Sequence, residues 1–180
     1  RQHYPMVAPK KFFEMYPLEK MKVPPLIKGD LDDIPPAAYG IQNGELLNKT
    51  KEGRRGMWQA YYASVTFMDE QLGKVLDELD RQGLTESTAI VFTTDHGYHL
   101  GEHGFWQKGN LHEEVTRVPL MIRTPGLKPG RTSSLAELVD FYPTCLDLLG
   151  LPAPKEIVGK SLVPILDKPK NKVRDTALSL

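Results

Sequence analysis

The chain has 180 residues, of which 40% are hydrophobic and 26% are charged. This composition is ordinary for a globular protein, and the length fits one domain or part of a larger one. The 23 basic and 23 acidic residues balance, which argues against a nucleic-acid binder that works through bulk positive charge. No apolar run approaches the roughly 18 residues of a membrane span. A single cysteine, Cys145, cannot form an internal disulfide or a multi-cysteine metal site.

Prolines divide the chain into three stretches. Seven lie within residues 1–36 and eight within 119–180, and the stretch between them contains none. Because proline lacks a backbone donor and fixes φ, we expect irregular segments at both ends and long elements in the middle. Residues 1–56 are predicted to form an irregular excursion with one short helix at about 10–15. Such an excursion is either functional, packed on a larger body, or a plain surface loop.

The later part of the chain, residues 57–180, is predicted to form an α/β core portion. Apolar residues recur at three- and four-residue steps over 57–82, which predicts a helix. β-Branched and apolar runs at 88–94 and 118–123 predict buried strands, and a further short strand is expected at 134–139. A helix is predicted over 140–149, with its first residue, an aspartate, as the N-cap. The order favours a mainly parallel sheet with flanking helices.

The densest group of chemistry-bearing residues is segment 93–108, which holds three of the five histidines. Ligands of open α/β sheets bind outside the carboxyl ends of strands, so Asp95 and His96 stand where a site is expected. Three interpretations remain open: a turn capped by Asp95, a zinc site at His96, His99 and His103, or a divalent-cation site with Asp95 and His96 as two ligands. The last needs further ligands from outside this chain, because zinc takes about four and calcium about six to eight.

Several motifs in this segment and beyond it resemble those of a known enzyme family. They are Thr94-Asp-His-Gly, Leu-Gly-Glu-His-Gly, Trp-x-Lys108, Thr116-Arg-Val-Pro-Leu120, Asp140-Phe-Tyr-Pro-Thr144 and Gly159-Lys-Ser-Leu162. In this order they resemble the type I sulfatases of the alkaline-phosphatase-like superfamily. Three further stretches resemble the iduronate-2-sulfatase branch of this family. They are His3-Tyr-Pro, Pro35-Pro-x-Ala-Tyr39 and Tyr62–Asp69. The resemblance implies that residues 1–180 are the middle-to-late portion of one sulfatase domain, with the excursion 1–56 on the substrate side.

The resemblance also implies a reaction, which is hydrolysis of a sulfate ester on a sulfated sugar or glycosaminoglycan-like substrate. Asp95 matches a carboxylate ligand of the family's active-site calcium, and His96 stands where the family carries Asn or His beside that ion. Lys108 matches the lysine that binds a sulfate oxygen. His3 matches a histidine that contacts the sulfate and can donate a proton to the leaving group. Ligand chemistry alone favours zinc or manganese at an imidazole, so the calcium assignment comes from the resemblance.

Other residues of the cluster have two interpretations each. Tyr98 and Trp106 are candidates for the walls of a substrate pocket, with packing as the alternative. His103 is a third candidate for substrate binding, although we favour a structural role for it and for His99, in which their side chains satisfy the loop's own backbone. Residues 112–114 are expected to form a solvated helix start.

The family's nucleophile is a formylglycine made within a Cys-x-Pro-x-Arg type of motif, which this chain does not contain. Cys145 is followed by Leu-Asp, and we interpret it as a small core residue. Asp32-Asp33 is followed by Ile-Pro-Pro, which indicates a loop rather than the family's paired aspartates. We therefore expect the formylglycine and half of the cation shell in a preceding part of the protein, and we expect these 180 residues alone to be inactive.

Two alternatives stay open. A phosphodiesterase or phosphonate hydrolase of the same superfamily would use two transition metals. A non-catalytic binding domain of sulfatase shape would lack the formylglycine motif in the full-length protein. Family habit suggests export, but the chain starts at Arg1 with no visible leader, which we interpret as the sign of a fragment. The expected partners are a sulfated substrate and the remainder of the same chain, with no nucleic acid and no membrane span.

Overall fold

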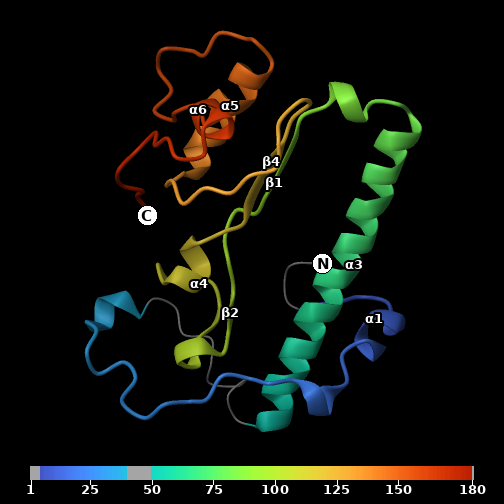
Figure 1. The fold of residues 1–180 in the computed structure, drawn as a ribbon. Coiled ribbons are helices and arrows are strands. Elements are labelled where there is room, and N and C mark those ends of the chain that lie inside the picture. Colours follow the sequence, from blue (N-terminus) through green and yellow to red (C-terminus); the bar gives the residue numbers. More distant parts are fainter. Residues whose placement is uncertain (1–4, 40–49, 180) are drawn as a thin grey trace. The chain divides into compact units, whose positions relative to one another are not determined.

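The computed structural model describes residues 5–39 and 50–179 (Figure 1). The chain divides into two compact units, and it passes between them more than once. The first unit is Arg1–Gln82 with His96–Arg117, and the second is Gly83–Asp95 with Val118–Leu180. This division has its boundaries after residues 82, 95 and 117. It follows from strand pairing, which groups the chain just after residue 83 with the chain just after residue 118.

One long helix, α3 (Lys51–Arg81), organises the first unit. It confirms the helix predicted at 57–82 but starts earlier, because Thr50 is an N-cap whose hydroxyl accepts a hydrogen bond from the amide of Gly53 at 3.0 Å. Arg54 and Met57 are buried and anchor the first turns. Among the helices of the described residues, none combines the length and the apolar character that a bilayer span requires.

A short helix, α1 (Lys10–Glu14), packs beside α3 (Figure 1) and confirms the helix predicted at about 10–15. Phe12 is 3% exposed, and its ring lies 5.2 Å from the ring of Phe67 on α3. The Tyr16 hydroxyl lies 2.6 Å from the Thr66 hydroxyl. Aromatic packing and side-chain hydrogen bonds therefore hold the start of the excursion against the long helix.

Segment 96–117 adds two short strands and a short helix to the first unit, besides a 3₁₀ turn at Glu102–Gly104. The strands are β2 (His99–Leu100) and β3 (Trp106–Gln107), and the helix is α4 (Glu113–Thr116). Strands β2 and β3 are antiparallel, with Leu100 opposite Trp106. Trp106 is 1% exposed and forms a core cluster with Leu100 and Met57 of α3. Burial of this indole fixes the hairpin on the long helix.

Two backbone hydrogen bonds close segment 96–117 on itself. The Gly97 amide donates to the Val115 carbonyl at 2.7 Å, and the Tyr98 amide donates to the Glu114 carbonyl at 2.9 Å. Gly97 is required here because a Cβ atom would lie 2.0 Å from the Glu114 carbonyl oxygen. The residues before β2 are thereby held against α4.

The second unit contains the strand pair β1 (Ile90–Thr93) and β4 (Leu120–Arg123). The strands predicted at 88–94 and 118–123 are confirmed in position. Their pairing is antiparallel, with Ile90 opposite Arg123, and β2 and β3 are antiparallel as well. Within the described residues, then, neither ladder is parallel, which differs from the mainly parallel sheet expected. The chain leaves β1 at Thr93 and enters β4 at Leu120, which is paired with Thr93, so β4 runs antiparallel to β1. A parallel pair would need a crossover connection to the opposite end of the strand.

Two helices lie in the later part of the second unit, α5 (Phe141–Leu148) and α6 (Val163–Asp167). The helix predicted at 140–149 is confirmed, and α6 was not predicted. The strand expected at 134–139 is wrong, because Leu138–Asp140 form a 3₁₀ turn, η5, that leads directly into α5. The apolar residues of this turn had suggested a strand by composition alone.

Asp140 is fully buried at the N-terminus of α5. It occupies the predicted N-cap position, but its carboxylate does not cap α5. It accepts hydrogen bonds from the amides of Glu137 at 2.9 Å and Lys160 at 2.8 Å. The guanidinium of Arg174 pairs with the same carboxylate and with that of Glu137. A buried ion pair therefore ties residue 174 to the start of α5.

We expect replacement of Arg174 by methionine to lower the free energy of unfolding by about 3–5 kcal/mol, because the Asp140 carboxylate would stay buried without its cation. Urea denaturation followed by circular dichroism measures this change. Lys172→Met is the matched control, since Lys172 is 71% exposed and lies 4.0 Å from Asp175. An exposed pair of this kind contributes about 0–1 kcal/mol. Equal losses in the two variants would contradict the role assigned to the buried pair.

We expect Gly97→Ala to open the closure of segment 96–117, because the new methyl group would overlap the Glu114 carbonyl. Hydrogen–deuterium exchange should show faster exchange of the Gly97 and Tyr98 amides, together with a lower Tm. Gly73→Ala is the control, since a Cβ at that position in α3 meets nothing within 4 Å. That change should stabilise the helix by about 0.5–1 kcal/mol. Unaltered protection of the Gly97 amide in Gly97→Ala would show that the closure does not depend on glycine.

Candidate functional site

The structure brings together two of the predicted site residues, Lys108, which was predicted to bind a sulfate oxygen, and His96, which was predicted to bind the cation. His96 precedes β2 and Lys108 follows β3. Because these strands are antiparallel, the residues before the first strand and after the second lie at the same end of the hairpin. The Lys108 Nζ atom is 2.5 Å from the His96 Nε2 atom. The hairpin thus converts a separation of twelve positions in sequence into direct contact.

Hydrogen bonding defines the protonation of the His96 ring. Its Nδ1 atom is 2.7 Å from the Gly97 carbonyl oxygen, which can only accept, so Nδ1 carries the hydrogen. The Nε2 atom then keeps its lone pair and accepts from the Lys108 ammonium. A cation bound at this imidazole would use the same lone pair, since Nδ1 is already a donor.

The backbone on both sides of Lys108 adopts the left-handed conformation. Gln107 has φ 68° and Gly109 has φ 141°. A glycine tolerates this region, whereas for glutamine it costs on the order of 1–2 kcal/mol. The turn directs Lys108 back toward His96, so local strain is stored next to the lysine that contacts the imidazole.

Asp95, the other predicted cation ligand, follows β1 in the second unit. It is exposed, and its Oδ1 atom lies 3.3 Å from the Thr94 hydroxyl. Asp95 stands just beyond the end of a strand, as predicted, and is next to His96 in sequence. His3, the fourth predicted site residue, lies outside the described residues.

The two aromatic candidates differ in burial. Tyr98 is half-buried, and its ring lies 5.4 Å from the ring of Tyr61 on α3. Trp106 is 1% exposed and packs against Leu100 and Met57, which is the packing role weighed against a place in a substrate pocket. The structure therefore uses Trp106 to hold the hairpin that presents Lys108.

His103 contacts the excursion rather than an open pocket. It has φ 55°, and its Nδ1 atom lies 2.9 Å from the Asp30 carboxylate. Its Nε2 atom is 3.9 Å from the Glu114 carboxylate. The trio of His96, His99 and His103 considered for zinc is not brought together, because His96 contacts Lys108 and His103 contacts Asp30.

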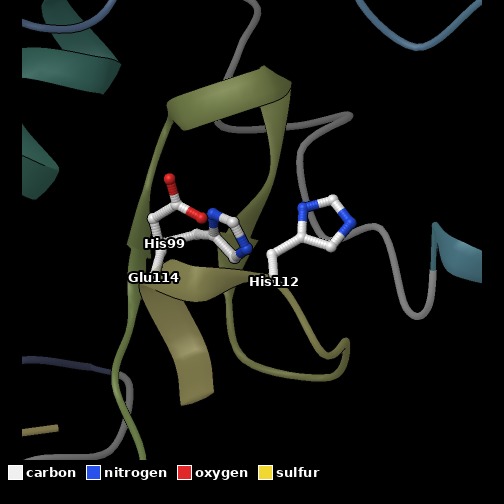
Figure 2. Close-up of side chains that lie close together, drawn as sticks. All are labelled: His99, His112 and Glu114. Carbon is white, nitrogen blue, oxygen red and sulfur yellow. The ribbon is translucent and has the colours of Figure 1, made fainter. Parts of the chain in front are cut away.

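A different group of metal-binding side chains does come together in the described residues: His99, His112 and Glu114 (Figure 2). One ligand atom from each lies within 4.8 Å of the others. Burial lowers the pKa of His99, whose ring is completely enclosed. We had expected residues 112–114 to be solvated, but only Glu113 is exposed. The missed signal is that His112 and Glu114 stand two positions apart at the first turn of α4, where both come close to His99 of β2.

Comparison with known proteins matches the sulfatase family model to residues 3–151. A sulfatase of Formosa agariphila is 40% identical, over 93% of this chain and 34% of that protein. The iduronate 2-sulfatase of Mus musculus is 34% identical, over 86% of this chain and 35% of that protein. The chain thus spans about a third of the length of these relatives.

Solved structures agree with this result. A phosphonate monoester hydrolase from Silicibacter pomeroyi matches with a TM-score of 0.81 and 30% identity, over 95% of this chain and 36% of that one. A protein solved in complex with its substrate D-glucosamine-2-N,6-O-disulfate matches with a TM-score of 0.64 and 38% identity, over 69% of this chain and 26% of that one. The neighbours share the alkaline-phosphatase-like fold, which confirms the α/β class. With its family model matched over most of its length and relatives above 30% identity, the chain belongs to the sulfatase family.

Proposed function

We propose that the full-length protein is a sulfuric ester hydrolase and that segment 96–117 supplies part of its sulfate-binding site. The observation that carries this proposal is the 2.5 Å contact between Lys108 and His96. It joins a cationic side chain to the imidazole that the family resemblance assigns to the cation shell. A fixed ammonium is suited to the sulfuryl oxygens, which gain negative charge in the transition state.

The residues of this chain fit a divalent cation in part. The Asp95 carboxylate is a suitable ligand for calcium, which prefers oxygen, and His96 offers one lone pair at Nε2. We assign both as ligands, with the rest of the shell from the remainder of the protein, and calcium is the ion that the resemblance favours. A bound cation would neutralise charge on the sulfuryl oxygens. Because Nε2 has only one lone pair, Lys108 would leave His96 when a cation is bound and donate instead to a sulfuryl oxygen.

The remaining roles lie partly outside the described residues. His3 would donate a proton to the departing alcohol, and a formylglycine in the preceding part of the protein would be the nucleophile. On this view the 180 residues alone have no turnover. We also place the mainly parallel sheet in the remainder of the domain, with β1 and β4 at its antiparallel margin and the excursion 1–56 on the substrate side.

The proposed substrate is a sulfated sugar. One relative is named an iduronate 2-sulfatase, and one structural neighbour was solved with a disulfated glucosamine as its substrate. Both names refer to a sulfated sugar or sugar acid. The iduronate-2-sulfatase-like motifs at the start of the chain favour a uronate-containing substrate of the glycosaminoglycan type.

We expect Lys108→Ala in the full-length protein to lower kcat for an aryl sulfate by about 10²–10³-fold, the loss typical of removing one oxyanion contact. Steady-state kinetics measures it. Lys74→Ala is the control, because Lys74 is 62% exposed on α3 and pairs with Glu70. Lys108→Arg keeps the charge and should retain more activity than the alanine variant. Unchanged kinetics in Lys108→Ala would remove this lysine from the site.

Hydrolysis of a phosphonate monoester is the second candidate function, favoured by the TM-score of 0.81 to a phosphonate monoester hydrolase. The two functions differ in the charge and size of the group transferred. If the protein is a sulfatase, kcat/KM for an aryl sulfate should exceed that for the matched aryl phosphonate monoester. The reverse order, measured with one enzyme preparation and one leaving group, would favour the phosphonate hydrolase.

A further inference from the structure

The group formed by His99, His112 and Glu114 is separate from the contact between Lys108 and His96. His99 lies on β2, and the other two residues lie at the start of α4. Figure 2 shows the Glu114 carboxylate beside the His99 ring, with the His112 ring on the other side of that ring. The rings of His99 and His112 have centroids 5.5 Å apart at an interplanar angle of 75°. The two rings therefore meet edge to face, and one ligand atom of each lies within 4.8 Å of the other.

Hydrogen bonds determine the tautomer of His99. Its Nε2 atom is 3.1 Å from the Oδ1 atom of Asn110. The same Oδ1 atom accepts from the His112 backbone amide at 3.2 Å, which identifies it as the amide oxygen. Nε2 of His99 must therefore be the donor, and Nδ1 keeps the lone pair. Within the described part of the chain, this Nδ1 atom is buried and has no hydrogen-bond partner.

The His112 ring has the same tautomer. Its Nε2 atom is 3.1 Å from the Ala38 carbonyl oxygen, which can only accept. Nε2 therefore carries the hydrogen, and the lone pair of His112 is also on Nδ1. Metal-bound histidines usually donate their other ring N–H to a carbonyl or carboxylate, which fixes the ring and the tautomer. Both imidazoles already have that outer hydrogen bond.

The group therefore consists of hydrogen-bond acceptors. Glu114 contributes a carboxylate, and a second carboxylate oxygen, from Glu102, lies 4.0 Å from His99 Nδ1. A buried acceptor without a donor costs about 1–3 kcal/mol. A second proton on His99 would supply a donor, but burial of the ring opposes the charged form. A cation shared by the acceptors removes the conflict.

We propose that His99, His112 and Glu114 bind a divalent transition-metal ion, with Zn²⁺ as the best match. Two imidazole nitrogens and one carboxylate oxygen are a ligand set that zinc uses, with a fourth position left for water or another side chain. Imidazole ligands disfavour calcium and magnesium, which prefer oxygen. His103 lies beside this group, with its Nε2 atom 3.9 Å from the Glu114 carboxylate.

The site would have a structural consequence. The ion would connect β2 to α4, the two elements that the amides of Gly97 and Tyr98 already hold together. Lys108 lies on the chain between these elements. Zinc binding would thus stabilise the loop that presents Lys108, without contact between the ion and the lysine.

The test is zinc binding by the full-length protein, measured by equilibrium dialysis and elemental analysis with excess Ca²⁺ present to fill oxygen-rich sites. We expect the wild type to bind one more equivalent of Zn²⁺ than Glu114→Gln. Asn110→Ala removes the hydrogen bond that fixes the tautomer of His99, and it should weaken zinc binding by about 10–100-fold. Zinc should also raise the Tm of the wild type and leave that of Glu114→Gln unchanged.

Glu113→Gln is the matched control, because Glu113 is the adjacent residue, is exposed, and pairs with Arg117 at 3.3 Å. It should bind zinc like the wild type. Equal zinc stoichiometry and affinity in the wild type, Glu114→Gln and Asn110→Ala would overturn the site, as would no zinc binding by the wild type. If Glu114→Gln does not fold, the test is the visible absorption spectrum of the Co²⁺-loaded wild type and Asn110→Ala. An intense band of four-coordinate Co²⁺ in the wild type that weakens in Asn110→Ala supports the site. Absence of this band from the wild type refutes the site.

Discussion

Two backbone hydrogen bonds, from the amides of Gly97 and Tyr98 to the carbonyls of Val115 and Glu114, close segment 96–117 into a loop. Every candidate functional contact of the first unit depends on this closure. It holds β2 against α4, and the β2–β3 hairpin then brings Lys108 back to His96. The closure requires a residue without a side chain at position 97, so a single glycine controls how the segment folds.

The same loop places histidines in opposite electrostatic settings. The lone pair of His96 faces the ammonium of Lys108, so that imidazole acts as an acceptor for a cationic side chain. The lone pair of His99 is buried near carboxylates and has no donor in the described part of the chain. The first arrangement is suited to an anionic substrate, because the Lys108 ammonium can donate its hydrogen bond to the substrate in place of His96. The second is suited to a metal ion, because one cation can be shared by several acceptors at once.

Much of the fold could be predicted from local patterns. The three- and four-residue apolar period predicted most of α3, and the β-branched runs predicted β1 and β4 in position. The direction of pairing could not be predicted, because it depends on the path of the chain between the strands. Likewise, the irregular excursion was predicted to run to residue 56, whereas the Thr50 cap and the burial of Arg54 and Met57 start the helix at Lys51.

By itself, the sequence determined the family and the identity of the sulfate-binding candidates, because the order of the motifs and the residue types within them do not depend on the three-dimensional structure. It also determined that Lys108 and His96 belong to one segment. Only the tertiary structure decided that their side chains touch, that Trp106 is a core residue, and that His112 and Glu114 lie against His99. Those contacts join residues on different elements, and the burial and hydrogen bonds that assign a tautomer or exclude solvent arise only after the elements pack.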